Sequence, residues 1–90
     1  MILERFRLDD RVAIVTGAGK GIGRGISLGC AEAGADVVCA ARTEADIEAT
    51  AEAVRERGRR AIAVPTDVLE TAALERLVAE TIETFGRIDI

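Results

Sequence analysis

Short apolar runs alternate with stretches of helical periodicity, and this alternation restricts the fold more than any other feature of the chain. The runs are short and rich in small or β-branched residues, which is typical of strands buried on both faces of a parallel sheet. They cover residues 12–15, 36–41 and 61–64. Because a helical segment follows each run, the order predicts an α/β fold, a doubly wound parallel sheet with right-handed crossovers.

The first predicted helix begins at Gly21 and ends at Gly34 as its C-cap. Its expected buried face has helical spacing and consists of Ile22, Ile26, Gly29, Cys30 and Ala33. A glycine inside a helix costs about 1 kcal/mol relative to alanine. We therefore expect Gly25 and Gly29 to be compensated by a close approach of this helix to the sheet.

The second and third predicted helices carry signals at their ends. In the second, Thr43 followed by Asp46 forms a capping-box pattern, and Gly58 ends the helix. Its apolar stripe consists of Ile47, Ala51 and Val54. The third helix is expected over roughly 70–85 with Gly86 as its cap. Its apolar residues at helical spacing are Leu74, Leu77, Val78, Ile82 and Phe85.

A fourth apolar run, from Ile88 to Ile90, begins where the sequence ends. In a doubly wound sheet of this kind the strands stand in the order 3-2-1-4, so the run is expected beside the first strand. The sheet is then incomplete, with a βαβαβα order and the start of a fourth strand. We expect the natural chain to continue beyond Ile90.

Composition argues against several classes of function. A net charge of -4 and an aromatic content of 2% provide neither the basic surface nor the stacking platform of a nucleic-acid-binding protein. The chain has no His and no Tyr, so it lacks the commonest metal ligand and two common proton-transfer groups. Cys30 and Cys39 have no metal-ligand spacing and are expected to be buried free thiols. We predict no metal site.

The sequence contains no apolar stretch of membrane-spanning length. Its first residues, Met1 to Arg5, do not form the apolar core of a signal peptide. We therefore expect a cytoplasmic protein without a membrane partner.

Residues 16–23, Thr-Gly-Ala-Gly-Lys-Gly-Ile-Gly, follow the first predicted strand and open the first helix. Glycines at such a turn let backbone N–H groups approach a pyrophosphate, which the positive end of the helix then faces. A plain glycine turn is the alternative, but the strand before and the helix after favour a phosphate site. Lys20 is followed by Gly21 rather than Ser or Thr, which excludes a P-loop. The pattern predicts that residues 1–90 form the N-terminal part of one Rossmann-type, dinucleotide-binding domain.

The end of the second strand distinguishes the two nicotinamide cofactors. A site for NAD usually has an acidic residue there, which binds the ribose hydroxyls. Here Ala41 ends the strand and Arg42 follows. Arg42 and Lys20 are cations suited to the 2′-phosphate of NADP through charge-assisted hydrogen bonds. NADP is therefore the expected cofactor, with NAD as the alternative if Arg42 is a solvated loop residue.

Three separated motifs resemble the short-chain dehydrogenase/reductase family and together span almost the whole chain. They are the segment from Leu8 through the glycine-rich turn, Thr66-Asp67-Val68, and residues 85–90, Phe-Gly-Arg-Ile-Asp-Ile. The resemblance implies that the cofactor phosphates and the adenosine ribose lie against Gly17, Gly19, Lys20, Gly21, Ile22 and Gly23. It places the 2′-phosphate at Arg42 and the adenine ring at Asp67 and Val68. The carboxylate of Asp67 could instead cap the third helix.

The sequence departs from this family in three respects. Asp10 stands where a glycine is usual, and Leu69 stands where a Ser or Thr cap is common, so Asp67 or Thr71 is expected to cap the third helix. The family's Asn-Asn-Ala-Gly segment, catalytic Ser and Tyr-x-x-x-Lys would follow Ile90. We therefore assign no catalytic residue within the 90 residues.

The resemblance implies an NADP-dependent oxidoreductase that, when intact, transfers a hydride between the nicotinamide and a small-molecule carbonyl or alcohol. A homo-oligomer is expected for the full-length protein. Two alternatives stay open. One is a non-catalytic product that binds nucleotide or nothing, and the other is an NAD-using dehydrogenase.

Overall fold

Three parallel strands form one sheet in the order β1-β2-β3 in the computed structural model, which describes residues 7–90. They are β1 (Val12–Thr16), β2 (Asp36–Ala41) and β3 (Ala61–Pro65). Every residue of the central strand except Ala41 is buried, which explains the uninterrupted apolar sequence that follows Asp36. Residues 1–5, on which the expectation about a signal peptide rests, lie outside the described range.

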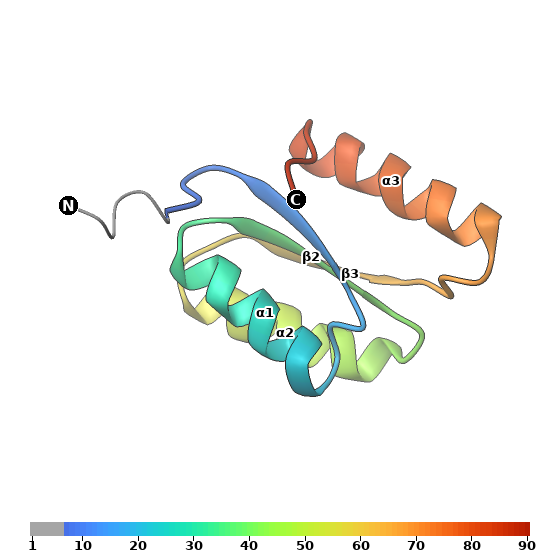
Figure 1. Cartoon of the computed structure of the whole chain (residues 1–90), viewed down its shortest axis with the longest axis horizontal. Helices are drawn as coiled ribbons and strands as arrows, with labels where there is room; N and C mark the ends of the chain where they lie inside the picture. The colour runs from blue at the N-terminus through green and yellow to red at the C-terminus, as the bar shows by residue number, and fades with distance from the viewer. Residues whose placement is uncertain (1–6) are drawn as a thin grey trace.

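Helices cover both faces of this sheet. Helices α1 (Gly21–Glu32) and α2 (Glu44–Glu56) lie on one face, and α3 (Thr71–Phe85) lies on the other (Figure 1). Buried side chains accordingly form two clusters, one around Cys39 and Ile47 and the other around Val38 and Leu77. Alternate residues of β2 therefore point to opposite layers, and the expected doubly wound α/β architecture of the Rossmann type is confirmed.

The last residues of the chain lie beside β1, as expected for the start of a fourth strand. The backbone N–H of Ile14 donates to the carbonyl of Ile90 at 2.9 Å, and the N–H of Ile90 donates to the carbonyl of Val12 at 3.2 Å. One residue bonded to two partners that are two apart is the pattern of a parallel pair. The final residues therefore lie where the order 3-2-1-4 places a fourth strand, although the sheet itself consists of β1, β2 and β3.

The expected buried face of α1 is wrong. Ile22 is 83% exposed and Ile26 is 51% exposed, whereas Ser27 and Ala31 are the buried residues of this helix. The hydroxyl of Ser27 donates to the carbonyl of Gly23 at 2.9 Å, so a polar side chain is satisfied on the face that packs on the sheet. Small residues line this face, and apolar periodicity alone could not reveal it.

The expected role of Gly25 and Gly29 is also wrong. A Cβ added at either position would meet nothing within 4 Å, so neither glycine allows α1 to approach the sheet. Gly23 instead allows α1 to approach the turn after β1, because a Cβ there would overlap the backbone of Gly17. At the other end of the helix the C-cap is Ala33, and Gly34 follows it with a φ of 107°. The expected glycine signal therefore lies one residue past the cap.

The N-terminal caps of α2 and α3 differ from those expected. Thr43 is the N-cap residue of α2 but makes no side-chain hydrogen bond there, and Asp46 faces Lys20 instead of closing a capping box. The N-cap residue of α3 is Glu70, so neither Asp67 nor Thr71 caps this helix. The C-terminal glycines are confirmed, since Gly58 and Gly86 adopt φ angles of 84° and 79°.

The apolar stripes of α2 and α3 are buried to different extents. Ile47, Ala51 and Val54 of α2 are all fully buried, as expected. On α3, Leu77 is buried but Val78 and Ile82 remain about half exposed. The cysteines also differ, because Cys39 is fully buried and Cys30 only half-buried, although both are free thiols. Burial raises the pKa of Cys39 to about 11.

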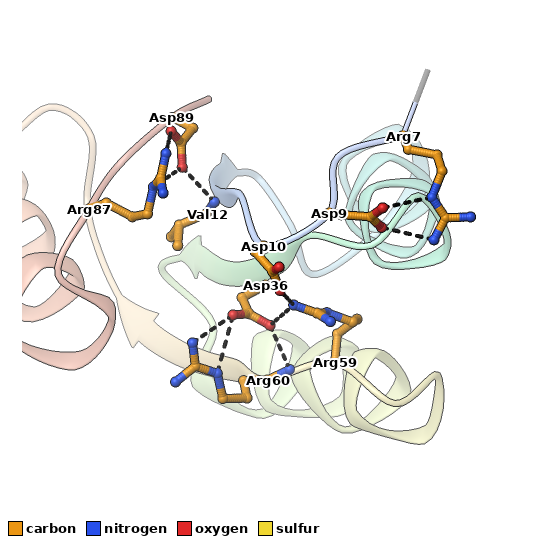
Figure 2. A network of polar contacts seen from close by, with 9 residues as sticks. All are labelled: Arg7, Asp9, Asp10, Val12, Asp36, Arg59, Arg60, Arg87 and Asp89. Atoms are coloured by element: carbon orange, nitrogen blue, oxygen red, sulfur yellow. Dashed lines mark hydrogen bonds and ion pairs between the residues drawn. The ribbon is translucent and has the colours of Figure 1, made fainter. Parts of the chain in front are cut away.

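Two carboxylates hold the amino-terminal edge of the sheet (Figure 2). Asp36, with a side chain 3% exposed, accepts from the backbone and guanidinium of Arg60 and pairs with Arg59 at 3.1 Å. Burial acts to raise the pKa of Asp36, but the hydrogen bonds from Arg60 and the charge of Arg59 outweigh it and lower the pKa. Asp89 accepts from the backbone N–H of Val12 at 2.9 Å and therefore fastens the final segment to β1.

Candidate nucleotide-binding site

The carboxyl ends of all three strands meet at one edge of the sheet, opposite the edge held by Asp36. The glycine-rich turn follows β1 there, Arg42 follows β2, and Thr66, Asp67 and Val68 follow β3. In open parallel sheets, ligands bind at this edge because loops from neighbouring strands converge on it. The predicted site residues therefore come together through the topology of the sheet.

Glycines of the turn are required for different physical reasons. Gly17 and Gly21 have φ angles of 64° and 54°, in the left-handed region that L side chains rarely adopt. Gly23 lies where a Cβ would overlap the carbonyl of Gly17. Gly19 lies against α2, since a Cβ there would lie 2.7 Å from the Cβ of Asp46. The turn is thus fitted to its own backbone and to a neighbouring helix.

Helix α2 also holds the turn through a buried side chain. The hydroxyl of Thr50 donates to the carbonyl of Ala18 at 2.9 Å and accepts from the guanidinium of Arg24 at 3.0 Å. Thr50 is fully buried, so its hydroxyl requires such partners. These contacts connect β1, α1 and α2 around one turn.

Two adjacent cavities open at this edge of the sheet. The larger, of about 390 Å³, is lined by Gly17, Ala41, Arg42, Thr66, Asp67, Val68 and Leu69. The smaller, of about 250 Å³, is lined by Gly17, Gly19, Lys20, Ala41, Arg42, Thr43 and Asp46. Arg42 borders both cavities, and Lys20 borders the smaller one. Two cations beside a glycine-rich turn form a surface suited to phosphate groups.

The nine residues predicted for this site differ in whether they line one of the two cavities. Gly17, Gly19, Lys20, Arg42, Asp67 and Val68 line the cavities. Gly21 and Gly23 shape the turn without lining either cavity. Ile22 is 83% exposed at the start of α1 and also lines neither. Asp67 accepts a hydrogen bond from the backbone N–H of Leu69 at 3.0 Å, which fixes its carboxylate at the rim of the larger cavity.

Comparison with known proteins decides the family. Residues 11–90 match the family model described as short chain dehydrogenase. The chain belongs to the short-chain dehydrogenase family. An uncharacterized oxidoreductase of Mycobacterium tuberculosis, MT0954, is 46% identical over 90 residues, which are all of this chain and 34% of that protein. Versicolorin reductase 1 of Aspergillus parasiticus is 42% identical over 88 residues, or 97% of this chain and 34% of that protein.

Solved short-chain dehydrogenases superpose closely on this fold. A hydroxysteroid dehydrogenase from Escherichia coli has a TM-score of 0.93 at 33% identity, covering 97% of this chain and 37% of that one. A short-chain dehydrogenase/reductase from Mycobacterium marinum has a TM-score of 0.94 at 31% identity, covering 99% and 36%. The chain therefore spans about one third of the length of the relatives that it matches.

Two residues of this site were not expected from the sequence. Thr50 lies three residues after Ile47 and four before Val54, so its place within the buried stripe of α2 was the available signal. Asp46 was interpreted as part of a helix cap, but its carboxylate lies 3.6 Å from the ammonium of Lys20. Both residues belong to α2 and contact the turn only because the two segments pack together.

Residues 7–90 contain no group of three or more His, Cys, Asp or Glu side chains placed to hold a metal ion. Within the same range, no helix has the length and apolar character needed to cross a membrane.

Proposed function

We propose that the full product of the gene encoding this chain is an NADP(H)-dependent oxidoreductase. Its substrate would be a small-molecule carbonyl or alcohol. When bound, the nicotinamide would supply or accept the hydride. The observation that carries the cofactor assignment is the placement of Arg42 and Lys20 on one cavity, next to a strand end that lacks an acidic residue. Family membership supports the reaction class.

Each part of the proposed cofactor has a matching surface in this chain. The turn at Gly17 to Gly23 would face the pyrophosphate with backbone N–H groups, because glycines leave that backbone uncovered. Arg42 and Lys20 would bind the 2′-phosphate. Asp67 and Val68, which line the larger cavity, would contact the adenine ring. These residues bind and orient the nucleotide, and we assign them no proton-transfer role.

Replacing Arg42 by alanine tests the choice of cofactor. A lost charge-assisted contact is worth about 1.5–3 kcal/mol, so the affinity for NADPH is expected to fall at least about tenfold. The affinity for NADH, which has no 2′-phosphate, should change little. Both affinities can be measured by titration of nicotinamide fluorescence.

The matched control for this experiment is Arg76→Ala, because Arg76 is an exposed arginine on α3 that lines neither cavity. It should leave both affinities unchanged. An equal loss of NADPH and NADH binding in Arg42→Ala would contradict the NADP assignment and favour an NAD-using enzyme or a general phosphate contact.

Three further properties are proposed from family membership and the exposed surface. Residues 1–90 form the N-terminal part of one dinucleotide-binding domain, as the match over residues 11–90 supports. The full-length protein is a cytoplasmic homo-oligomer. The half-exposed apolar residues Val78 and Ile82 on α3 support a packing surface on this side of the sheet.

A further inference from the structure

Asp46 places a carboxylate in the smaller cavity, where the proposed cofactor would bring a phosphate. Its Oδ2 atom lies 3.6 Å from Nζ of Lys20, and Arg42 lines the same cavity. The side chain of Asp46 is 33% exposed, whereas that of Lys20 is 85% exposed. The fixed partner of this ion pair is therefore the carboxylate, and the exposed partner is the ammonium.

The backbone of α2 keeps Asp46 close to the turn. A Cβ added at Gly19 would lie 2.7 Å from the Cβ of Asp46, so the two segments already touch. One turn further along α2, Thr50 donates to the carbonyl of Ala18 at 2.9 Å. Asp46 thus cannot move far from the turn unless α2 separates from it.

We infer that Asp46 sets the preference between NADPH and NADH by neutralising Lys20 and by repelling a 2′-phosphate at this cavity. This inference rests on the proposed function. A 2′-phosphate must take Lys20 away from its carboxylate partner and must lie near a second negative charge, and both effects weaken binding. A ribose hydroxyl brings no such charge and can donate a hydrogen bond to a carboxylate. Asp46 therefore reduces the preference for NADPH over NADH that Arg42 and Lys20 create.

Asp46→Asn removes the charge and keeps the shape, including the contact with Gly19. For a partly exposed pair of charges, the affinity for NADPH is expected to rise about three- to tenfold. The affinity for NADH should stay unchanged or fall. The gain for NADPH should shrink as salt is raised from about 0.05 to 0.5 M, because salt screens exposed charges. Nicotinamide fluorescence titrations of the full gene product at both salt concentrations measure these changes.

Glu48→Gln is the matched control. It removes the same charge from the same helix, but Glu48 pairs with Arg55 at 2.9 Å and does not line either cavity. Both nucleotide affinities should stay at the wild-type values. A double variant, Lys20→Met with Asp46→Asn, provides an independent readout. If Asp46 acts partly through Lys20, the gain from Asp46→Asn is smaller when Lys20 is absent.

The outcomes separate this inference from the proposed function. The role of Asp46 alone is overturned if the wild-type protein binds NADPH through Arg42 but Asp46→Asn leaves the ratio of NADPH affinity to NADH affinity unchanged or lowers it. A wild-type protein that binds neither nucleotide overturns both proposals. A wild-type protein that prefers NADH overturns the NADP assignment, and the effect of Asp46→Asn on NADPH binding then still decides the role of Asp46. If Asp46→Asn raises this affinity ratio equally at low and high salt, the electrostatic cause is overturned. If the increase becomes smaller as salt is raised, the result supports the inference.

Discussion

Replacing Gly23 by alanine is expected to destabilise the fold by about 2–3 kcal/mol, the cost of overpacking a tight contact, and to weaken nucleotide binding as well. The added Cβ would overlap the carbonyl of Gly17, which is backbone and cannot rotate away as the end of a long side chain can. Either the turn or the first turn of α1 must shift. Urea unfolding followed by circular dichroism gives the free energy, and NADPH titration reports the shape of the turn.

Gly25→Ala is the control for this prediction, because it makes the same chemical change two residues further along the same helix. A Cβ at Gly25 would meet nothing within 4 Å. Alanine there is expected to stabilise the protein by about 0.5–1 kcal/mol through helix propensity alone. If both variants shifted stability in the same direction, the close approach of Gly23 to Gly17 would not be the determining contact.

Replacing Asp36 by asparagine is expected to cost about 2–3 kcal/mol at pH 7, the value of charge-assisted hydrogen bonds at a buried site. The carboxylate connects β2 to Arg59 and Arg60 just before β3, and its side chain is 3% exposed. Asparagine keeps the size but provides one oxygen without charge. Urea unfolding at a series of pH values measures the loss.

The pH dependence of this loss has a definite sign. The pKa of Asp36 is lowered in the folded state, so its contribution is fully present above the unfolded value near 3.8 and is lost as the pH falls through the folded pKa. The difference between Asp36→Asn and wild type should therefore shrink below about pH 4. Glu32→Gln, which breaks an exposed pair with Arg57, should change stability by less than about 1 kcal/mol throughout. A difference for Asp36→Asn that stays constant down to pH 2 would contradict the ionic cause.

The strands were predictable because burial on both faces leaves a direct mark on sequence. Each residue from Val37 to Ala40 is apolar and buried, and β2 has the predicted bounds. The face of α1 was not predictable in this way. Ser27 is buried with its hydroxyl bonded to the carbonyl of Gly23, whereas the larger and apolar Ile22 is exposed. The distribution of large apolar residues along α1 therefore indicates a different face from the one that packs on the sheet.

Some residues of the candidate site could be predicted from sequence and others could not. Lys20 and Arg42 could be located from sequence because each lies in or next to a motif that ends a strand, and strand ends converge in any parallel sheet. Asp46 and Thr50 could not, since their contacts with the turn depend on how closely α2 packs beside it. Local sequence patterns predict the loops that follow strands, whereas contacts between a helix and a loop are known only once the packing of the layers is known.

The burial of Cys39 beneath the α1–α2 layer makes this thiol a built-in reporter of motion. With a pKa of about 11, only about one molecule in ten thousand carries the thiolate at pH 7. Covering side chains also bar reagents from the sulfur in the closed protein. Alkylation of Cys39 should therefore require these helices to leave the sheet, and a bound nucleotide that holds the turn to α2 should slow it.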